Sequence, residues 1–196
     1  MSGRLEAQFA FLNEADRLKS VLRATTLCDG SRRENSGEHS WHLALYAMVL
    51  ADQAAPGVDI TRVTAMLILH DLVEIDTGDV PIHSANGQAH GSADVLAAEQ
   101  AAADRIFGLL PPDLRDRFRA LWEEFEAAQT PDAIFSKSLD RVQPVMANLM
   151  SGGGTWATYD VTEDQLEQRV GVKVARGMPM VWTWLKEQAA AYFRNR

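Results

Sequence analysis

Apolar residues recur every three or four positions over most of the chain, which is the spacing of one face of an α-helix. Two stripes show this spacing, and they consist of Phe11, Ala15, Leu18 and Leu22, and of Leu114, Phe118, Leu121 and Phe125. No stretch shows the strict alternation of apolar and polar residues that is typical of a half-buried β-strand. The pattern therefore predicts an all-α fold.

Two of the expected helices differ in character. Residues 39–53 carry Leu43, Tyr46 and Leu50 on one side, as an amphipathic helix does. Residues 61–75 are almost entirely apolar until His70. A helix that is apolar all round packs inside a protein, so we expect this one at the centre of the fold.

Residue types that begin and end helices support the division into segments. These are Thr130 before Pro131, a capping box of Thr162 with Gln165, Pro111-Pro112 at the end of one helix, and Gly177-Met178-Pro179 between the last two. No repeat, low-complexity tract or linker divides the chain. The sequence thus predicts a single domain over residues 1–196, a bundle of about eight helices.

Two segments are poor in helix-forming residues. Residues 28–37 contain Arg32, Arg33 and two glycines, and residues 77–92 contain Gly78, Pro81 and two histidines, His83 and His90. Long irregular segments in compact domains are often binding loops, although a simple surface excursion has the same composition. Neither histidine is assigned a role from the sequence.

Composition and charge exclude several classes of protein. The 196 residues are 46% hydrophobic, which is ordinary for a globular protein. No apolar run approaches the length of a membrane span, and we expect no membrane partner. The formal net charge of −8 argues against binding a nucleic acid duplex, but it leaves room for a local site for one small phosphate. Cys28 is the only cysteine, so no intrachain disulfide forms and the cytoplasm is the expected location.

The most informative stretch is HDLVE, residues 70–74. On a helix, Glu74 lies on the same side as His70 and Asp71, which are four and three positions earlier. Burying an imidazole and two carboxylates together is costly unless something compensates for it, and a divalent cation would do so. The alternative is a helix end whose charged residues lie in water.

Further candidate ligands lie on two other predicted helices. His39 opens one of them, and Asp140 lies beside the apolar stripe of another. An ion pair with Lys137, one turn earlier, is the alternative role for Asp140. Together, His39, His70, Asp71 and Asp140 form a mixed imidazole and carboxylate set. Such a set suits one divalent ion of Mn, Co, Fe, Ni or Mg, with Zn also acceptable, better than a thiolate-rich structural zinc site.

Four ordered blocks resemble the HD-domain phosphohydrolases. They read RENSGEHS over residues 33–40, HDLVE over 70–74, TGDVP over 77–81 and KSLDR over 137–141. Within that family the chain is similar to the subgroup of bacterial 5′-deoxynucleotidases, over about residues 12–184. The resemblance implies a helical HD-type fold in which His39, His70, Asp71 and Asp140 bind the metal. It also implies that Glu74 and Asp79 are the nearby catalytic carboxylates.

The implied activity is removal of phosphate from a nucleoside 5′-monophosphate by water that the metal activates. Glu74 is the candidate for orienting or deprotonating that water, and its alternative role is to hold a ligand histidine in place. Asp79 is the candidate for protonating the leaving alkoxide or binding a sugar hydroxyl. Its alternative role is that of a turn-forming aspartate.

Phosphate also requires cationic partners, and arginine can bind it with two hydrogen bonds. The candidates are Arg23, Arg32, Arg33, Lys137 and Arg141, of which we select Arg23, Arg33 and Lys137 as substrate-binding. Arg23 ranks first because the resembling subgroup places a substrate-binding arginine at the end of the first helix. In that subgroup a bulky aromatic residue follows and crowds the ribose 2′ position. Ala24 stands here, so strict deoxyribose preference is not expected.

Two other functions fit the same residues. One keeps the site and changes the substrate to (p)ppGpp or a non-nucleotide phosphomonoester. The other is a non-catalytic nucleotide- or metal-binding regulator, against which the presence of Glu74 and Asp79 argues, since binding alone requires neither. A homodimer is the predicted assembly. The last helix has a surplus of apolar residues, namely Trp182, Trp184, Leu185 and Phe193, which could equally pack on the chain's own core.

Overall fold

The structure is a computed structural model that describes residues 2–89 and 91–195. His90 therefore lies outside the described residues. Most of the described chain is helical, which confirms the predicted all-α class. The longer helices are α1 (Ser2–Ala15), α2 (Ser36–Val49), α3 (Ile60–Leu69), α5 (Ala93–Phe107), α6 (Pro112–Ala127), α7 (Pro131–Met150) and α11 (Pro179–Arg194). None of the described helices has the length and apolar character needed to cross a membrane.

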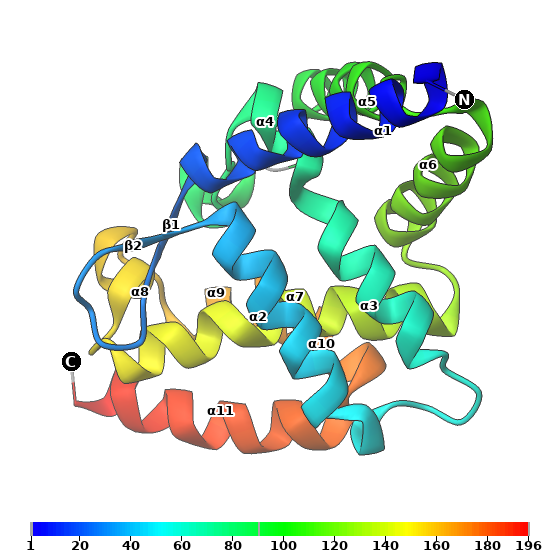
Figure 1. The fold of residues 1–196 in the computed structure, drawn as a ribbon. Helices are drawn as coiled ribbons and strands as arrows, with labels where there is room; N and C mark the ends of the chain where they lie inside the picture. The colour runs from blue at the N-terminus through cyan, green and yellow to red at the C-terminus, as the bar shows by residue number, and fades with distance from the viewer. Residues whose placement is uncertain (1, 90, 196) are drawn as a thin grey trace.

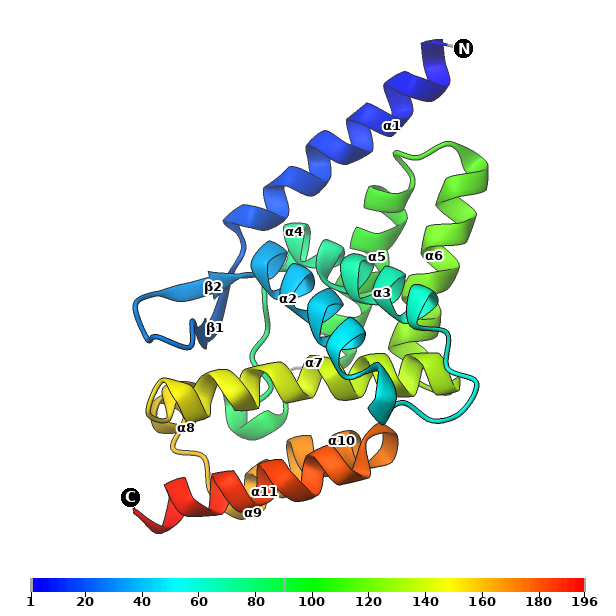
Figure 2. The ribbon, with the colours of Figure 1, turned by 60° about the horizontal axis from the view of Figure 1, so that its bottom comes forward.

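Helix α7 runs through the middle of the molecule, with α2 and α3 crossing it on one side and α11 lying along it on another (Figure 1). Helices α1, α5 and α6 form the opposite end, and Figure 2 shows α1 projecting from the body there. The short segments α8 (Gly154–Thr158), α9 (Glu163–Leu166) and α10 (Val172–Gly177) connect α7 to α11. This arrangement brings α2, α3 and α7, distant in sequence, to a common centre.

The predicted central helix is buried along one face, where Val63, Met66 and Leu67 of α3 have no exposed surface, whereas Arg62 and Ile68 on its other side are exposed. Each such buried side chain contributes roughly 1.5–3 kcal/mol through its burial. The α-helix is shorter than expected, because it ends at Leu69 and continues as a tight 3-10 turn, His70–Val73, and the short α4 (Glu74–Thr77). The expected cap of Thr130 on α7 is present, as is the Thr162–Gln165 capping box.

The expectation that the chain forms no strand is wrong. Residues 22–26 and 33–35 form an antiparallel hairpin of β1 (Leu22–Thr26) and β2 (Arg33–Asn35). The alternation is inverted relative to an ordinary surface strand: Arg23 and Thr25 are buried, whereas Leu22 is 54% exposed. Leu22 is therefore not part of a helical stripe. A search for buried apolar residues misses a strand whose inward side chains are polar.

The hairpin leads directly into α2, which begins earlier than expected, at Ser36. The side chain of Asn35 accepts a hydrogen bond from the amide of Glu38, and the Glu38 carboxylate accepts one from the amide of Asn35. This capping box fixes the first turn of α2. His39 lies in that turn, so the cap also fixes the position of its imidazole.

Candidate metal centre

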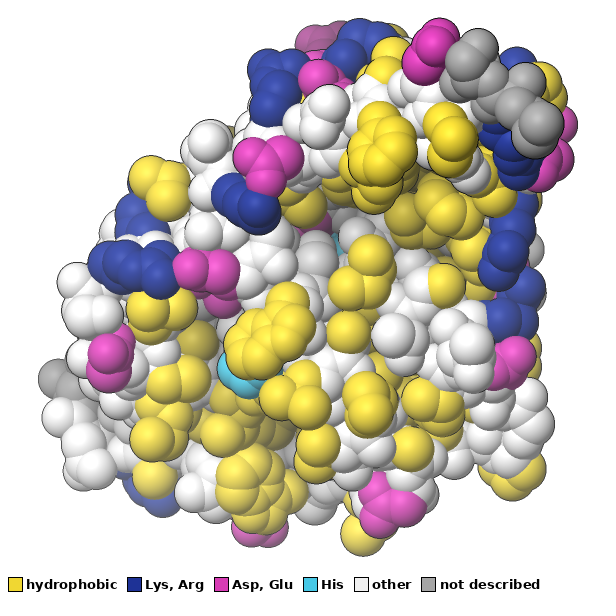
Figure 3. All heavy atoms as spheres, in the orientation of Figure 1, with side chains coloured by type: hydrophobic (Ala, Val, Ile, Leu, Met, Phe, Trp, Pro, Cys, Tyr) yellow, Lys and Arg dark blue, Asp and Glu magenta, His cyan; other side chains and the backbone are white. Residues whose placement is uncertain are grey.

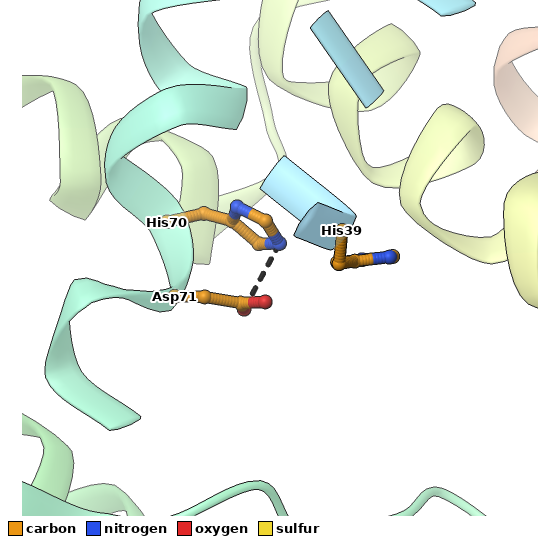
Figure 4. Close-up of side chains that lie close together, drawn as sticks. All are labelled: His39, His70 and Asp71. Atoms are coloured by element: carbon orange, nitrogen blue, oxygen red, sulfur yellow. Dashed lines mark ion pairs between the residues drawn. The ribbon is translucent and has the colours of Figure 1, made fainter. Parts of the chain in front are cut away.

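Three of the predicted ligands lie together at the meeting point of α2 and the end of α3. One ligand atom each from His39, His70 and Asp71 lies within 4.8 Å of the other two, and all three residues are buried. Figure 4 shows His70 and Asp71 extending side by side from the turn after α3 toward His39, which comes from α2. The Nε2 atom of His70 is 2.9 Å from Oδ1 of Asp71.

Asp140 of α7 completes the set that the sequence predicts. Its Oδ1 is 3.1 Å from Nε2 of His39 and 3.8 Å from Nε2 of His70. Asp140 is buried, and its predicted alternative, an ion pair with Lys137, is not what the structure shows, because Lys137 pairs with Glu126 at 3.0 Å. Two imidazoles and two carboxylates from three helices thus surround one space.

The second nitrogen of each imidazole is held by a hydrogen bond. Nδ1 of His70 donates to the carbonyl of Leu67 at 2.8 Å, and Nδ1 of His39 lies 3.1 Å from Oε1 of Gln143. An imidazole that donates from Nδ1 presents its Nε2 lone pair, which is the usual orientation of a metal-ligating histidine. Both Nε2 atoms point into the cluster.

The tight turn after α3 is fixed by α6. The indole of Trp122 donates a hydrogen bond to the carbonyl of His70 at 3.2 Å, and the ring of Phe125 packs edge-on against the His70 imidazole. Both aromatic residues are almost fully buried. Because the turn carries two of the candidate ligands, α6 holds their position even though it contributes none of the four.

Two observations on His70 indicate that these residues are suited to binding a divalent cation. Nε2 of His70 is buried and makes no well-oriented hydrogen bond to a described residue, although Oδ1 of Asp71 lies 2.9 Å away, and such a group is costly unless something binds it. Burial disfavours charge on His70, yet the carboxylates of Asp71 and Asp140 raise its pKa to about 10. The carboxylates therefore attract positive charge to this space, and a divalent ion would supply that charge there.

The same electrostatics act on the carboxylates. Burial opposes ionisation of Asp140, but Arg141 and the two histidines hold its pKa well below the usual value. Burial also opposes ionisation of Asp71, but His70 and Arg23 hold its pKa low. Both groups are therefore anionic over the physiological range, as metal ligands must be.

Arg23 lies against this cluster, at the start of the hairpin. Its Nη1 is 2.8 Å from Oδ2 of Asp71, and 3.7 Å from carboxylate oxygens of both Glu74 and Asp79. The side chain is only 9% exposed. A buried guanidinium among three carboxylates is held in place firmly, and it lines a cavity that begins at the ligands.

Glu74 and Asp79 lie on the same side of the cluster as Arg23. The hydroxyl of Ser36 donates to Oε2 of Glu74 at 2.5 Å, and the amide of Ala24 donates to Oδ2 of Asp79 at 3.1 Å. Burial and the neighbouring Asp71 raise the pKa of Glu74 well above its usual value. Burial likewise raises the pKa of Asp79, although Arg23 opposes the shift.

The other two basic residues selected from the sequence are placed differently. Lys137 lines a second cavity, on another side of the cluster, with its ammonium above the Phe125 ring. Arg33 lines neither of these two cavities, because its guanidinium donates to the backbone carbonyls of Leu22 and Arg23 in β1. The structure thus does not bring Arg33 to the site, and its role is to hold the hairpin.

Two relationships with known proteins bear on this site. A model of the HD domain matches residues 15–182, which is most of the chain and contains all four predicted ligands. The chain belongs to the HD-domain family. A solved structure from Magnetospirillum magnetotacticum, described as that of a predicted metal-dependent phosphohydrolase, is 42% identical with a TM-score of 0.90 over 98% of this chain and 96% of that one.

Other proteins that match this chain are more distant. The human 5′-deoxynucleotidase HDDC2 is 29% identical over 69% of this chain and 64% of that protein. An Enterobacter 5′-deoxynucleotidase is 29% identical over 63% of each. The chain thus spans about two thirds of the length of these relatives. A protein from Pyrococcus furiosus shares the fold at 20% identity, with a TM-score of 0.60.

Sequence reasoning missed Gln143, which holds a predicted ligand of this HD domain. Its Oε1 contacts the His39 ring, while its Nε2 donates to Oε2 of Glu34 at 3.0 Å. Glutamine is an ordinary residue on a helix, but position 143 lies one turn after Asp140, so it shares that residue's face. This spacing is the signal that would have identified it.

Replacing Gln143 with leucine removes the acceptor for His39 while keeping a side chain of similar size. Loss of such a partner typically lowers metal affinity 10- to 100-fold, and we expect a decrease of about that size. Titration of the chelator-stripped protein with Mn²⁺ measures it. An unchanged affinity would show that Gln143 does not orient the histidine.

Proposed function

We propose that this HD-domain chain is a metal-dependent phosphohydrolase that removes phosphate from a nucleoside 5′-monophosphate. The observation that carries the proposal is the convergence of His39, His70, Asp71 and Asp140 on one space beside a cavity that Arg23 lines. Several relatives are named 5′-deoxynucleotidases, which supports the choice of a nucleotide. Mn, Co, Fe, Ni or Mg would suit this mixed oxygen and nitrogen site.

A divalent ion held by His39, His70, Asp71 and Asp140 would lower the pKa of water and would stabilise the charge that builds on the phosphoryl group. Glu74 is the residue that orients the attacking water or accepts its proton. The hydrogen bond from Ser36 fixes one of its oxygens, and Arg23 lies close to the other. Glu74 is thus positioned at the edge of the cluster rather than within the set of ligands.

Asp79 is the residue for the leaving group. Its carboxyl group lines the cavity from the segment after α4, where it is placed to donate a proton to a leaving alkoxide, and burial raises its pKa. The Ala24 amide holds one of its oxygens, which leaves the other for the substrate. The same oxygen could accept a hydrogen bond from a sugar hydroxyl.

Arg23 is the residue for the phosphate. The guanidinium of Arg23 has five N–H donors, and its hydrogen bond to Asp71 does not use all of them. Its buried position beside the candidate ligands suits binding of a phosphate at the metal. Lys137 approaches from the second cavity and remains a candidate for a phosphate oxygen on that side. Arg33 is not proposed as substrate-binding.

The remainder of the first cavity suits a nucleoside. Its walls include apolar and aromatic side chains, and Ala24 and Thr25 of β1 line it as well. Alanine at position 24 leaves room where a bulky side chain would crowd a ribose hydroxyl. We therefore expect activity on both ribo- and deoxyribonucleotides.

A phosphate-release panel tests this function directly. Purified protein is assayed with Mn²⁺, Co²⁺ or Mg²⁺ on ribo- and deoxyribonucleoside 5′-monophosphates, on (p)ppGpp and on simple phosphomonoesters. We expect turnover of the monophosphates, with ribose and deoxyribose forms within about tenfold of each other, or 1.4 kcal/mol. Turnover of another ester without any nucleoside monophosphate would overturn the substrate, and no hydrolysis with any metal would favour a binding regulator.

We also propose that the protein is a homodimer, although the apolar surface differs from the predicted one. Trp182 and Leu185 of α11 are buried in the chain's own core, whereas Trp184 is 51% exposed. The larger exposed stripe lies on one face of α2, at Trp41, Leu45, Met48 and Val49. Figure 3 shows hydrophobic side chains gathered over α2, next to those over α11. Contiguous apolar patches of this kind usually mark an interaction surface.

Light scattering on a size-exclusion column tests the assembly. We expect a mass of twice the 21.7 kDa of one chain, and a shift to the monomer when Met48 is replaced with glutamate, because the charge would be buried in the interface. Glu6→Lys on α1, a charge change at a polar exposed position, is the matched control. A monomeric mass for the unaltered protein would exclude this assembly.

Two further proposals rest on composition alone. The single cysteine, Cys28, fits a reducing compartment, so we propose a cytoplasmic location. The acidic balance of the chain fits a small nucleotide rather than a nucleic acid duplex as the substrate.

A further inference from the structure

His83 is a buried histidine that none of the roles above uses. It lies in the segment between α4 and α5, next to a 3-10 turn, η4 (Ser84–Gly87). The side chain is 7% exposed and lines the cavity that also contains Arg23 and Asp79. A polar ring in such a position either packs against the wall or contacts what the cavity binds.

The segment around His83 is held from the opposite wall by Arg169. This arginine lies in a π-helical turn, η5 (Glu167–Gly171), a rare form that is frequent at functional sites. Its Nη1 is 3.4 Å from Nδ1 of His83, and its Nη2 donates to the carbonyl of Asn86 at 2.9 Å. Arg169 therefore fixes both the ring and the backbone beside it.

The backbone at this point requires such support. Ala85 and Asn86 have φ values of 46° and 55°, in the left-handed region. An alanine there costs about 1–2 kcal/mol. The strain is offset by the contact that Asn86 makes with Arg169, so the segment is held in one conformation rather than left free.

The contact with Arg169 also decides which nitrogen of His83 carries the proton. A guanidinium has donors only, so Nδ1 of His83 accepts and is unprotonated. A neutral ring then carries its proton on Nε2. Burial, followed by the charges of Arg169 and Arg141, lowers the pKa of His83 to about 4, which keeps the ring neutral at physiological pH.

Among the described residues, the only hydrogen-bond contact of His83 is the one between its Nδ1 and Arg169, so its Nε2–H group stays available to a molecule in the cavity that His83 lines. On the side of Tyr159, whose ring centroid is 6.5 Å from that of His83, the wall of the cavity is aromatic. The phosphate belongs with the metal ligands and Arg23. The uncharged part of the substrate, its sugar and base, belongs with these walls.

We infer that His83 is a specificity-determining residue whose Nε2–H donates a hydrogen bond to an acceptor on the nucleoside, in the tautomer that Arg169 fixes. The inference rests on the proposed function, because it requires a nucleoside in this cavity. Arg169 acts as a positioning residue through His83 and does not touch the substrate.

Kinetics with two substrates test the role of His83. His83→Phe keeps a ring of similar shape but removes the donor, and His83→Gln retains an amide donor. We expect the KM for a nucleoside 5′-monophosphate to rise about tenfold in His83→Phe, which is the value of one hydrogen bond, with partial recovery in His83→Gln. On p-nitrophenyl phosphate, which has no nucleoside, both variants should match the unaltered protein.

Each other outcome overturns the inference. An unchanged KM for the nucleotide means that the ring only packs against Tyr159. An equal loss on both substrates means that His83 supports the metal site instead. These outcomes differ from a failure of the proposed function itself. In that case the unaltered protein would hydrolyse p-nitrophenyl phosphate but no nucleotide.

Nitrogen-15 NMR of the Mg²⁺-loaded protein tests the tautomer without reference to activity. We expect the His83 signals to show a protonated Nε2 and an unprotonated Nδ1 throughout pH of about 6 to 8. Arg169→Met should mix the two tautomers and raise the nucleotide KM toward that of His83→Phe. Arg115→Met, which removes an exposed arginine paired with Asp116, is the matched control. Protonation on Nδ1 in the unaltered protein would contradict the inference.

Discussion

Replacing Asp71 with asparagine is expected to remove both the bound metal and the phosphohydrolase activity. The change keeps the size of the side chain but removes a negative charge that His70 and Arg23 contact at 2.9 Å and 2.8 Å. Metal ions contribute several kcal/mol to hydrolysis, and each 1.36 kcal/mol is a factor of ten. We expect a loss of at least about 1,000-fold in kcat/KM.

Metal analysis and phosphate release, measured on the same preparation, check this result. The matched control is Asp76→Asn, five positions later, which removes an exposed carboxylate paired with Arg105. The control should retain both metal and activity. Retention of metal and turnover in Asp71→Asn would remove this carboxylate from the set of ligands.

Replacing Glu74 with glutamine is expected to abolish most of the turnover and to leave the metal bound. Glu74 lies beside the cluster, where Ser36 and Arg23 hold it, and it is not among the four proposed ligands. A positioned general base typically contributes 10²- to 10⁴-fold, so kcat should fall by about that factor while the KM changes little.

Single-turnover kinetics and metal content together check the role of Glu74. Glu123→Gln is the control, because this glutamate is exposed on α6 and pairs with Arg119. If Glu74→Gln kept full turnover, Glu74 would be a structural neighbour only. If it lost its metal, Glu74 would have to be counted as a group that supports the ligands.

The metal ligands could be predicted from the sequence because they carry their own signal. His70 and Asp71 follow a mainly apolar helix whose last five residues are all apolar, and buried polar residues in that place require compensation. The family blocks then extend the set to His39 and Asp140. The structure brings these four residues together, and the helical fold that does so was also predictable from periodicity and caps.

The hairpin could not be predicted in the same way. Strand prediction looks for apolar residues on the buried side, but β1 buries Arg23 and Thr25 and exposes Leu22. Those polar side chains are inward because they line the cavity beside the metal site. Because the inward side chains of β1 are the polar ones that line the cavity, the strand lacks the buried apolar residues by which a strand is usually recognised.

The residues that form hydrogen bonds to the site histidines also could not be identified from the sequence. Gln143 holds His39, and Arg169 holds His83 across 86 positions of the chain. A glutamine or an arginine in a sequence does not indicate such a role, because the contact with the histidine exists only once the chain has folded. Nearness in sequence to the first candidate ligand is a weak guide as well, since the side chain of Arg33 donates to the hairpin backbone and does not line the cavity.

Anomalous diffraction from crystals grown with Mn²⁺ tests the central claim most directly. We expect one strong peak per chain, in contact with Nε2 of His39, Nε2 of His70 and carboxylate oxygens of Asp71 and Asp140. The peak should be absent in crystals of Asp71→Asn grown under the same conditions. A peak elsewhere, or none at this position in the unaltered protein, would contradict the proposed metal centre.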